Sequence, residues 1–216
     1  MKILSLDSAA AGCGVCLWQD GRVIADRLEG MLRGQDARLI PLVQETMFDA
    51  GWEFDALDRI AVTRGPGSFT GLRVGLAAAR GMGFASGKPV LGIDRFSVFR
   101  QACQTAGRPL LVVLDSRRAE LYTCWVEADG AMQAPKLLTV EQIVRELAAR
   151  EEGRLAGDCP ELLPELADSG RWVQPASSES VCAAALAAAA VLDDPAFLPR
   201  PLYLRPPDVT MKGCAS

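Results

Sequence analysis

The chain has 216 residues, of which 50% are hydrophobic and 23% charged, and it contains no histidine. This composition predicts a folded protein with one large domain or two small ones. The lack of histidine excludes Ser-His-Asp and Cys-His nucleophilic sites and every zinc site that needs imidazole. The formal charge of −4 argues against a broad phosphate-binding surface, so contact with nucleic acid is expected to be indirect or local.

The cysteines indicate a reducing compartment. There are seven, scattered along the chain without the framework of a small secreted domain. Residues 1–7 are too short for the apolar core of a signal peptide, and no apolar run approaches the ~20 residues of a membrane span. We therefore predict a cytoplasmic protein that does not contact a membrane. Cys13 and Cys16 have CxxC spacing, but on a strand they face opposite sides, which favours a structural role.

The first half is predicted to be a mixed sheet that opens with β-hairpins and is flanked by helices. Strands are expected at residues 2–7, 15–19, 22–28, 59–63 and 90–94, and helices at 36–49, 70–86 and 97–106. A strand that follows a crossover helix pairs in parallel with the strand before it.

The second half repeats the beginning of the first. Strands are expected at residues 110–115, 120–126 and 154–157, and helices at 139–149 and 181–192. Each half opens with a buried strand that ends in an acid, Asp7 or Asp115, followed by a turn and a second strand. We therefore predict two α/β lobes that share one cleft. They would comprise residues 1–106 and a smaller lobe of residues 107–216, whose late helix would pack back on the first lobe.

A glycine-rich loop joins the strand 59–63 to the next helix. Its residues are Gly65, Pro66, Gly67, Ser68, Phe69 and Thr70. Such a strand-to-helix loop is a potential anion site, but this one lacks the Lys-Ser/Thr pair of Walker A and contains no GxGxxG. Arg73 stands in the first helical turn, where the helix dipole disfavours a cation, so we expect it to have an acidic partner in this chain or another.

Small residues recur every four positions along the helix 70–86. They are Gly71, Gly75, Ala79 and Gly83. Each glycine inside a helix costs about 0.5–1 kcal/mol relative to alanine, so the stripe needs a compensating contact. Two interpretations remain open: close packing on the protein's own sheet, or a helix-to-helix contact with another subunit.

The paired acids resemble the phosphate-hairpin positions of a two-lobed nucleotide-binding fold. Carboxylates at such positions can hold Mg²⁺ through water. The residues that follow each acid lack the Gly and Thr that phosphate hairpins need. We therefore predict a vestigial nucleotide cleft at Asp7, Ser8, Asp115 and Arg117, with no metal and no cofactor.

Four segments carry a family resemblance: residues 3–8, the loop 65–73, the turn 114–117 with 120–122, and the tail 201–205. Together they resemble the bacterial tRNA threonylcarbamoyladenosine biosynthesis family TsaB, also called YeaZ. The resemblance implies an actin-like (ASKHA) fold. It also implies a non-catalytic subunit required for threonylcarbamoylation of the adenosine beside the anticodon in tRNAs that read codons beginning with A.

The resemblance further implies a set of partners. The chain would bind, stabilise and activate the catalytic paralogue TsaD, which holds its metal through histidines, and a TsaE-type ATPase would join the pair. It would meet tRNA only indirectly, and it could form a homodimer through the same face when alone. The contact would be made by the helices 36–49 and 70–86. The expected contact residues are Leu39, Val43, Met47, Gly71, Arg73, Val74, Gly75, Ala78, Ala79, Met82 and Gly83.

One position departs from the family pattern: many relatives carry a histidine near the start of the first helix, where this sequence has Gln35. The alternative function is an autonomous enzyme of the same fold. It would be a nucleotide hydrolase that uses Asp7 and Asp115, or a protease.

Overall fold

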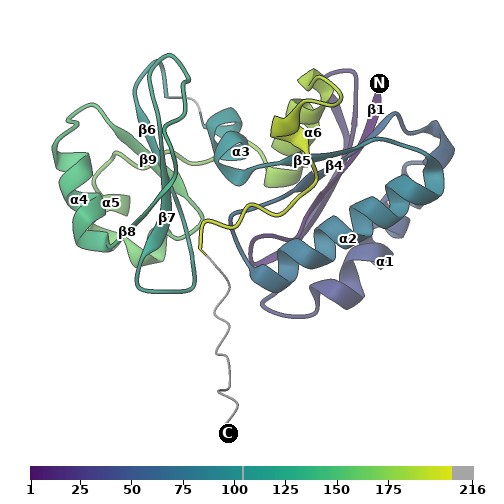
Figure 1. Ribbon diagram of the computed structural model, residues 1–216, viewed down its shortest axis with the longest axis horizontal. Coiled ribbons are helices and arrows are strands. Elements are labelled where there is room, and N and C mark those ends of the chain that lie inside the picture. Colours follow the sequence, from purple (N-terminus) through teal and green to yellow (C-terminus); the bar gives the residue numbers. More distant parts are fainter. Residues whose placement is uncertain (104, 206–216) are drawn as a thin grey trace, which may run out of the picture.

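The computed structural model describes residues 1–103 and 105–205, which form two β-sheets with helices around and between them (Figure 1). The first sheet has the order β3-β2-β1-β4-β5 and the second the order β8-β7-β6-β9. The strands of the first sheet are β1 (Lys2–Asp7), β2 (Gly12–Gln19), β3 (Arg22–Gly30), β4 (Arg59–Thr63) and β5 (Val90–Ile93). Those of the second are β6 (Leu110–Leu114), β7 (Leu121–Val126), β8 (Lys136–Leu138) and β9 (Arg154–Gly157).

The helices are α1 (Gln35–Asp49), α2 (Phe69–Ser86), α3 (Arg95–Ala102), α4 (Val140–Ala148), α5 (Pro164–Ala167) and α6 (Glu179–Ala189). Short 3₁₀ turns lie at Phe54–Ala56, Pro160–Leu162 and Pro195–Phe197. The predicted helix 97–106 begins earlier, at Arg95, because Asp94 caps it by accepting from the Ser97 N–H. The predicted helix 181–192 is displaced in the same direction, because Ser178 is its N-cap.

The two sheets repeat one pairing pattern. In the first, β1 pairs antiparallel with β2 and parallel with β4. In the second, β6 pairs antiparallel with β7 and parallel with β9. This confirms the predicted repeat of mixed sheets that open with hairpins. The short strand β8, which extends the second sheet, was not predicted.

Alternate side chains of the first sheet enter two different cores. Leu4 and Leu6 of β1 face α1 and α2, whereas Ile3 faces the opposite side, which α6 covers. Figure 1 shows α1 and α2 side by side on one face of this sheet. The inner strands of this sheet are therefore buried on both faces, in agreement with their largely apolar sequences, whereas the edge strand β3 is mostly exposed.

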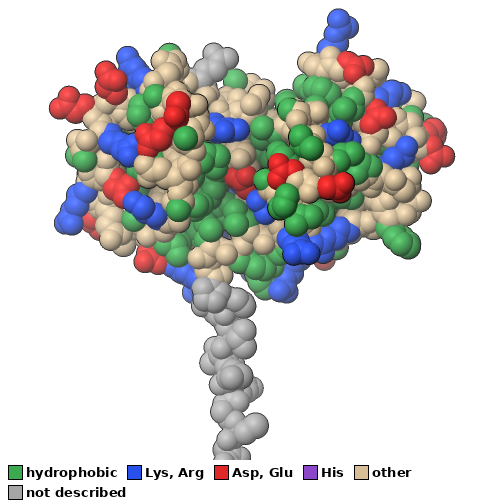
Figure 2. All heavy atoms as spheres, turned by 45° about the horizontal axis from the view of Figure 1, so that its top comes forward, with side chains coloured by type: hydrophobic (Ala, Val, Ile, Leu, Met, Phe, Trp, Pro, Cys, Tyr) green, Lys and Arg blue, Asp and Glu red, His purple; other side chains and the backbone are tan. Residues whose placement is uncertain are grey.

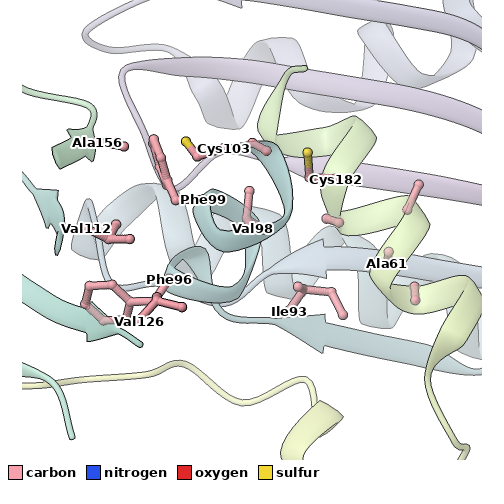
Figure 3. Packing of buried hydrophobic residues seen from close by; sticks show 14 of the residues in the cluster. Ala61, Ile93, Phe96, Val98, Phe99, Cys103, Val112, Val126, Ala156 and Cys182 are labelled. Atoms are coloured by element: carbon pink, nitrogen blue, oxygen red, sulfur yellow. The ribbon is translucent and has the colours of Figure 1, made fainter. Parts of the chain in front are cut away.

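Helix α3 lies between the two sheets and joins their cores. Figure 3 shows Phe96 and Phe99 of α3 packed between first-sheet residues such as Ile93 and second-sheet residues such as Val112. Alanines on α6 complete this cluster against the first sheet. The division of the chain after residue 106 stays a prediction, but α6 lies on the first sheet although it follows the second along the chain.

The CxxC cysteines lie on opposite faces of β2, as the strand geometry predicts. Cys13 belongs to the core under α1, and Cys16 to the core shared with α3 and α6. Burial raises the pKa of Cys13 to about 11 and that of Cys16 to about 12, so both thiols are protonated near neutral pH. Every cysteine that the structure describes is free and buried, and Cys214 lies outside the described residues.

No helix in the described part of the chain has the length and apolar character needed to cross a membrane. The proline-rich tail is non-helical as far as residue 205, and the rest of it lies outside the described residues.

The structure decides between the two interpretations of the glycine stripe. A Cβ at Gly71 would lie 1.9 Å from the Ser8 carbonyl oxygen, and one at Gly83 would lie 2.3 Å from a methyl carbon of Val90. The stripe therefore packs on the protein's own first sheet. The prediction that Gly71, Gly75, Ala79 and Gly83 contact a partner is wrong, because this packing buries them.

The expected contact residues of α1 are also buried inside the protein. Leu39 and Val43 are fully buried and Met47 is 3% exposed, all three within the core that α1 forms with the first sheet. The predicted partner contact is therefore wrong for them as well.

Two glycines of α2 offer a matched test of this packing. We expect Gly71→Ala to lower the free energy of unfolding by about 1–3 kcal/mol, because the new methyl group collides with backbone. Gly81→Ala should raise it by about 0.5–1 kcal/mol, since nothing lies within 4 Å of that Cβ and alanine favours the helix. Urea unfolding followed by circular dichroism measures both. Equal effects of the two substitutions would contradict the assignment of the stripe to the protein's own core.

Candidate functional site

A cleft of about 520 Å³ opens at the carboxyl ends of β1, β6 and β9. Its lining contains five carboxylates and one arginine: Asp7, Asp115, Asp158, Glu161, Glu179 and Arg117. The structure thus brings the predicted acids, one from each sheet, into one cleft. The site corresponds to the usual ligand position in α/β proteins, at the carboxyl ends of parallel strands.

Asp7 is held by groups of its own sheet. It is 3% exposed, the Thr63 hydroxyl donates to its Oδ1, and the Ala9 backbone N–H donates to the same oxygen at 3.1 Å. Thr63 ends β4, which runs parallel to β1, so the two side chains meet at one edge of the sheet. Much of the hydrogen-bonding capacity of Asp7 is therefore satisfied inside the protein.

Asp115 is bound by the turn that follows it. The Arg117 Nε lies 3.1 Å from Asp115 Oδ2, and the Arg117 backbone N–H donates to Oδ1 at 2.6 Å. Arg117 adopts a φ of 60°, a left-handed conformation that favours glycine. The amide that a phosphate hairpin would offer to a ligand is thus used by Asp115 itself.

Ser8 does not line the cleft, so its predicted role there is wrong. It is 1% exposed, and its hydroxyl donates to the Gly71 carbonyl oxygen at 2.8 Å. This bond fixes the start of α2 on the turn after β1.

The cleft has an unfavourable electrostatic character for phosphate, because its carboxylates outnumber its one cation. Within residues 1–103 and 105–205, no group of three or more Asp, Glu, Cys or His side chains is arranged to hold a metal ion.

Beneath the cleft lies a buried cation that the sequence reasoning missed. The Arg95 side chain is 0% exposed, and its guanidinium donates twice to Glu179, at the start of α6. It also donates to Asp158 at 2.8 Å and to the Pro66 carbonyl oxygen at 3.1 Å. Asp158 in turn accepts from the Asp115 backbone N–H at 2.8 Å. One guanidinium thus joins both sheets, α6 and the glycine-rich loop.

The buried pair has opposed electrostatic effects. Burial raises the pKa of Glu179 to about 7, while the Arg95 guanidinium acts in the opposite direction. Burial disfavours the charged form of Arg95, but the carboxylates of Glu179 and Asp158 outweigh it and raise the pKa of Arg95 well above its ordinary value. Arg95 therefore stays charged, and Glu179 depends on it for its own ionisation.

The glycine-rich loop packs on the turn after β1. The Ser68 N–H donates to the Ala9 carbonyl oxygen at 2.8 Å, and a Cβ at Gly67 would lie 2.4 Å from that oxygen. The Ser68 hydroxyl caps α2 by accepting from the Gly71 N–H at 3.2 Å. Gly65 precedes a cis peptide bond to Pro66, and its carbonyl oxygen accepts from the Arg95 N–H at 2.8 Å. These groups serve the fold itself, which leaves the predicted anion role without support.

Gln35 begins α1 and is 8% exposed. Its side-chain amide donates to the Met31 carbonyl oxygen at 3.3 Å. The position at which the family resemblance implies a histidine is therefore a buried helix start in this chain.

The surface of α1 and α2 carries a second set of small residues that the sequence reasoning missed. Ala77, Gly81 and Ala85 recur every four positions on the exposed side of α2, opposite the buried stripe. On the same helix Phe84 is 93% exposed, and on α1 Phe48 is 84% exposed. The signal was present in the sequence, but the glycine stripe is the stronger pattern.

Similarity to known proteins shows which family this chain belongs to. The family model described as TsaD: tRNA N6-adenosine threonylcarbamoyltransferase matches residues 32–148, more than half of the chain. The chain belongs to this family. The TsaB protein of Escherichia coli (strain K12) is 33% identical over 129 residues, which cover 59% of this chain and 54% of that protein. The TsaB protein of Haemophilus influenzae is 32% identical over 124 residues, 56% of this chain and 52% of that protein.

The chain spans about half the length of these two TsaB proteins. An uncharacterized protein of Mycobacterium tuberculosis, Rv3421c, is 34% identical over 217 residues, with 95% of this chain and 92% of that protein covered. The resemblance to TsaB and YeaZ proteins that the sequence motifs predict is confirmed.

Solved structures confirm the actin-like fold. A Pseudomonas aeruginosa protein described as similar to peptidase YEAZ superposes with a TM-score of 0.75 and 26% identity, with 94% of this chain and 99% of that chain covered. The activator of 2-hydroxyisocaproyl-CoA dehydratase from Clostridium difficile, with bound ADPNP, shares the fold at a TM-score of 0.56 and 8% identity, with 87% of this chain and 94% of that chain covered.

Removal of Arg95 should destabilise the protein in a pH-dependent way. We expect Arg95→Met to lower the free energy of unfolding by about 3–5 kcal/mol at pH 8, because the largely buried Glu179 must either stay charged without a partner or take up a proton at a pH far above its unfolded pKa. The loss should be smaller at pH 5. The variant raises the folded-state pKa of Glu179 further above its unfolded value, so protonation stabilises the folded state at low pH, and this stabilisation is lost as the pH rises.

Urea unfolding at both pH values measures the effect. Arg145→Met, on the exposed surface of α4, is the control and should change stability little at either pH. A loss for Arg95→Met that is independent of pH would contradict the pairing with Glu179.

Proposed function

We propose that this chain is a non-catalytic subunit of the machinery that forms threonylcarbamoyladenosine in tRNA, and that it binds, stabilises and activates a TsaD-type transferase. Support comes from its membership of the TsaD family and from relatives that are named TsaB. The observation that carries the proposal is an exposed helical face of small residues on α2, which offers a docking site for another helix.

Several features argue against catalysis by the chain itself. The sequence has no histidine, and so lacks the metal ligands that the family resemblance implies for the catalytic subunit. Asp115 is bound by its own turn, and the Asp7 Oδ1 is engaged by Thr63. The thiols of Cys13 and Cys16 are protonated near neutral pH, so neither is a ready nucleophile.

The docking face on α2 has the features of a helix-packing surface. Ala77, Gly81 and Ala85 allow a second helix to approach closely, because their side chains occupy little space. Phe84 on α2 and Phe48 on α1 are exposed apolar groups, and their burial by a partner would contribute to binding. Of the originally expected contact residues, Arg73, Val74, Ala78 and Met82 are exposed or half-buried and stay predictions. The joining of a TsaE-type ATPase also stays a prediction.

Gly81 is the position that tests this docking face. We expect Gly81→Arg to abolish co-purification with the cognate TsaD-type subunit, because the long side chain fills the space that the partner helix needs. The fold should be retained, since nothing lies within 4 Å of a Cβ at Gly81. Ala148→Arg, on an exposed position of α4, is the matched control and should co-purify normally.

Size-exclusion chromatography of the co-expressed pair reads out this test, and circular dichroism checks that each variant is folded. Wild-type binding by Gly81→Arg would refute the assignment of the docking face. Gly75→Leu is not a suitable test of the docking face. A Cβ at Gly75 would lie 2.5 Å from the Ser8 hydroxyl oxygen, so this substitution would destabilise the fold.

The purified chain should not hydrolyse ATP. We expect no phosphate release above background in the presence of Mg²⁺, because the acidic cleft repels phosphate and its hairpin amide at Arg117 is engaged. A coupled phosphate assay measures this. Hydrolysis that is abolished by Asp7→Asn would favour the alternative of an autonomous nucleotide hydrolase.

A further inference from the structure

Two segments of the chain are rich in arginine and lack acids. Residues 64–86 and 198–205 contain five arginines and no Asp, Glu or Lys, in a chain whose formal charge is −4. The arginines are Arg64, Arg73, Arg80, Arg200 and Arg205. The first segment comprises the glycine-rich loop and α2, and the second is the last described part of the chain.

The fold brings these segments together. The Leu202 N–H donates to the Arg64 carbonyl oxygen at 2.8 Å, and Arg80 donates to the Pro199 carbonyl oxygen. The segment 198–205 therefore runs alongside the loop and α2. In Figure 2, Lys and Arg side chains gather along the lower edge of the right-hand lobe, on the side where Figure 1 places α2.

Most of this positive charge is not neutralised. Arg205 forms an ion pair with Glu120 of the second sheet. Within residues 1–103 and 105–205, the other four arginines have no carboxylate partner, and the buried Nε of Arg64 makes no hydrogen bond. The acidic partner predicted for Arg73 is therefore absent from the described part of the chain.

Two exposed aromatic rings lie among these arginines. Phe69 and Tyr203 are 44% and 41% exposed, and their ring centroids are 5.6 Å apart at an interplanar angle of 33°. The Arg73 guanidinium lies 3.7 Å from the centroid of the Phe69 ring, and its Nε donates to the Tyr203 hydroxyl at 3.3 Å. The cluster thus presents planar groups to solvent in a fixed arrangement, beside charges that lack partners.

We propose that this arginine surface, formed by Arg64, Arg73, Arg80 and Arg200 with Phe69 and Tyr203, binds RNA. The inference deepens the proposed function, on which it rests for the identity of the RNA as a tRNA. Phosphates neutralise the arginines, and an unpaired base stacks on the aromatic rings. An acidic protein would satisfy the charges but would leave the rings without a matching planar group. The contact is local, as the net charge requires, but it is direct, in contrast to the prediction that tRNA is met only indirectly.

The surface adjoins the docking face, because Arg73 and Arg80 lie on the exposed side of α2 that also carries Ala77 and Gly81. Arg73 and Arg80 contact Tyr203 and the Pro199 carbonyl on the side of α2 next to the segment 198–205, whereas no atom lies within 4 Å of a Cβ at Gly81. The arginine variants are therefore tested for assembly with the partner as well as for RNA binding.

The test uses the complex of this chain with its TsaD-type partner and a fluorescent, unmodified transcript of a tRNA that reads a codon beginning with A. Fluorescence anisotropy gives the dissociation constant over a series of salt concentrations. Arg73→Glu combined with Arg200→Glu should weaken binding about tenfold or more and reduce the salt slope by about two, because two phosphate contacts are lost. Arg145→Glu, on the exposed face of α4, reverses a single charge away from this surface and is the charge-matched control for Arg200→Glu alone; it should behave as the wild type.

The aromatic rings are tested separately. Phe69→Ala combined with Tyr203→Ala should weaken binding about tenfold and leave the salt slope unchanged, because stacking and not charge is removed. Heparin, a polyanion without bases, should compete poorly with the tRNA for the wild-type complex. Equal competition, or no effect of the aromatic substitutions, would overturn the assignment to RNA, and unchanged affinity of the arginine variant would overturn the surface itself.

Size-exclusion chromatography separates this inference from the proposed function. If the wild-type chain fails to assemble with the TsaD-type subunit, the proposed function fails, whatever the RNA result. If Arg73→Glu impairs assembly, the complex that contains Arg200→Glu alone is used instead. Weaker tRNA binding by that complex than by the wild-type complex supports the inference, and equal binding overturns it.

Discussion

The arrangement of the two sheets depends on one buried guanidinium. Arg95 has no exposed surface, and a buried cation is tolerated only when carboxylates surround it. Its partners come from different parts of the fold, Asp158 after β9 and Glu179 at the start of α6. Any motion that opens the cleft would therefore break a buried ion pair. The hydrophobic cluster around α3 also contains residues of both sheets, so the same motion would expose apolar side chains.

This restraint gives the acidic cleft and the outer surface different roles. Around the cleft, Asp7 accepts from Thr63, and Asp115 is bound by Arg117. On the outer surface, by contrast, Phe84 and Arg200 have no comparable partner in the described part of the chain. The polar groups of the cleft are thus engaged within the protein, whereas exposed groups of the outer surface are not.

Much of the fold could be predicted from the sequence, because strand and helix periodicities are local. The two acid-ended strands, their hairpins and the repeat all follow from short segments. Periodicity shows which face of a helix carries small residues but not what packs against that face. It therefore cannot decide whether the glycine stripe contacts the protein's own sheet or another subunit. Arg95 could not be found, because its acids lie 63 and 84 residues away and no local pattern marks them. Ser8 was misplaced for a similar reason, since its hydrogen bond reaches α2.

The position of α6 has a consequence for biosynthesis. Helix α6 covers one face of the first sheet. The last strand of that sheet ends at Ile93, but α6 ends only at Ala189. A nascent chain that has emerged only as far as the second sheet therefore exposes apolar side chains such as Ile3, Cys16 and Ala61. The core on this face of the amino-terminal sheet therefore cannot be completed until α6 has left the ribosome, although the strands of the sheet are made early.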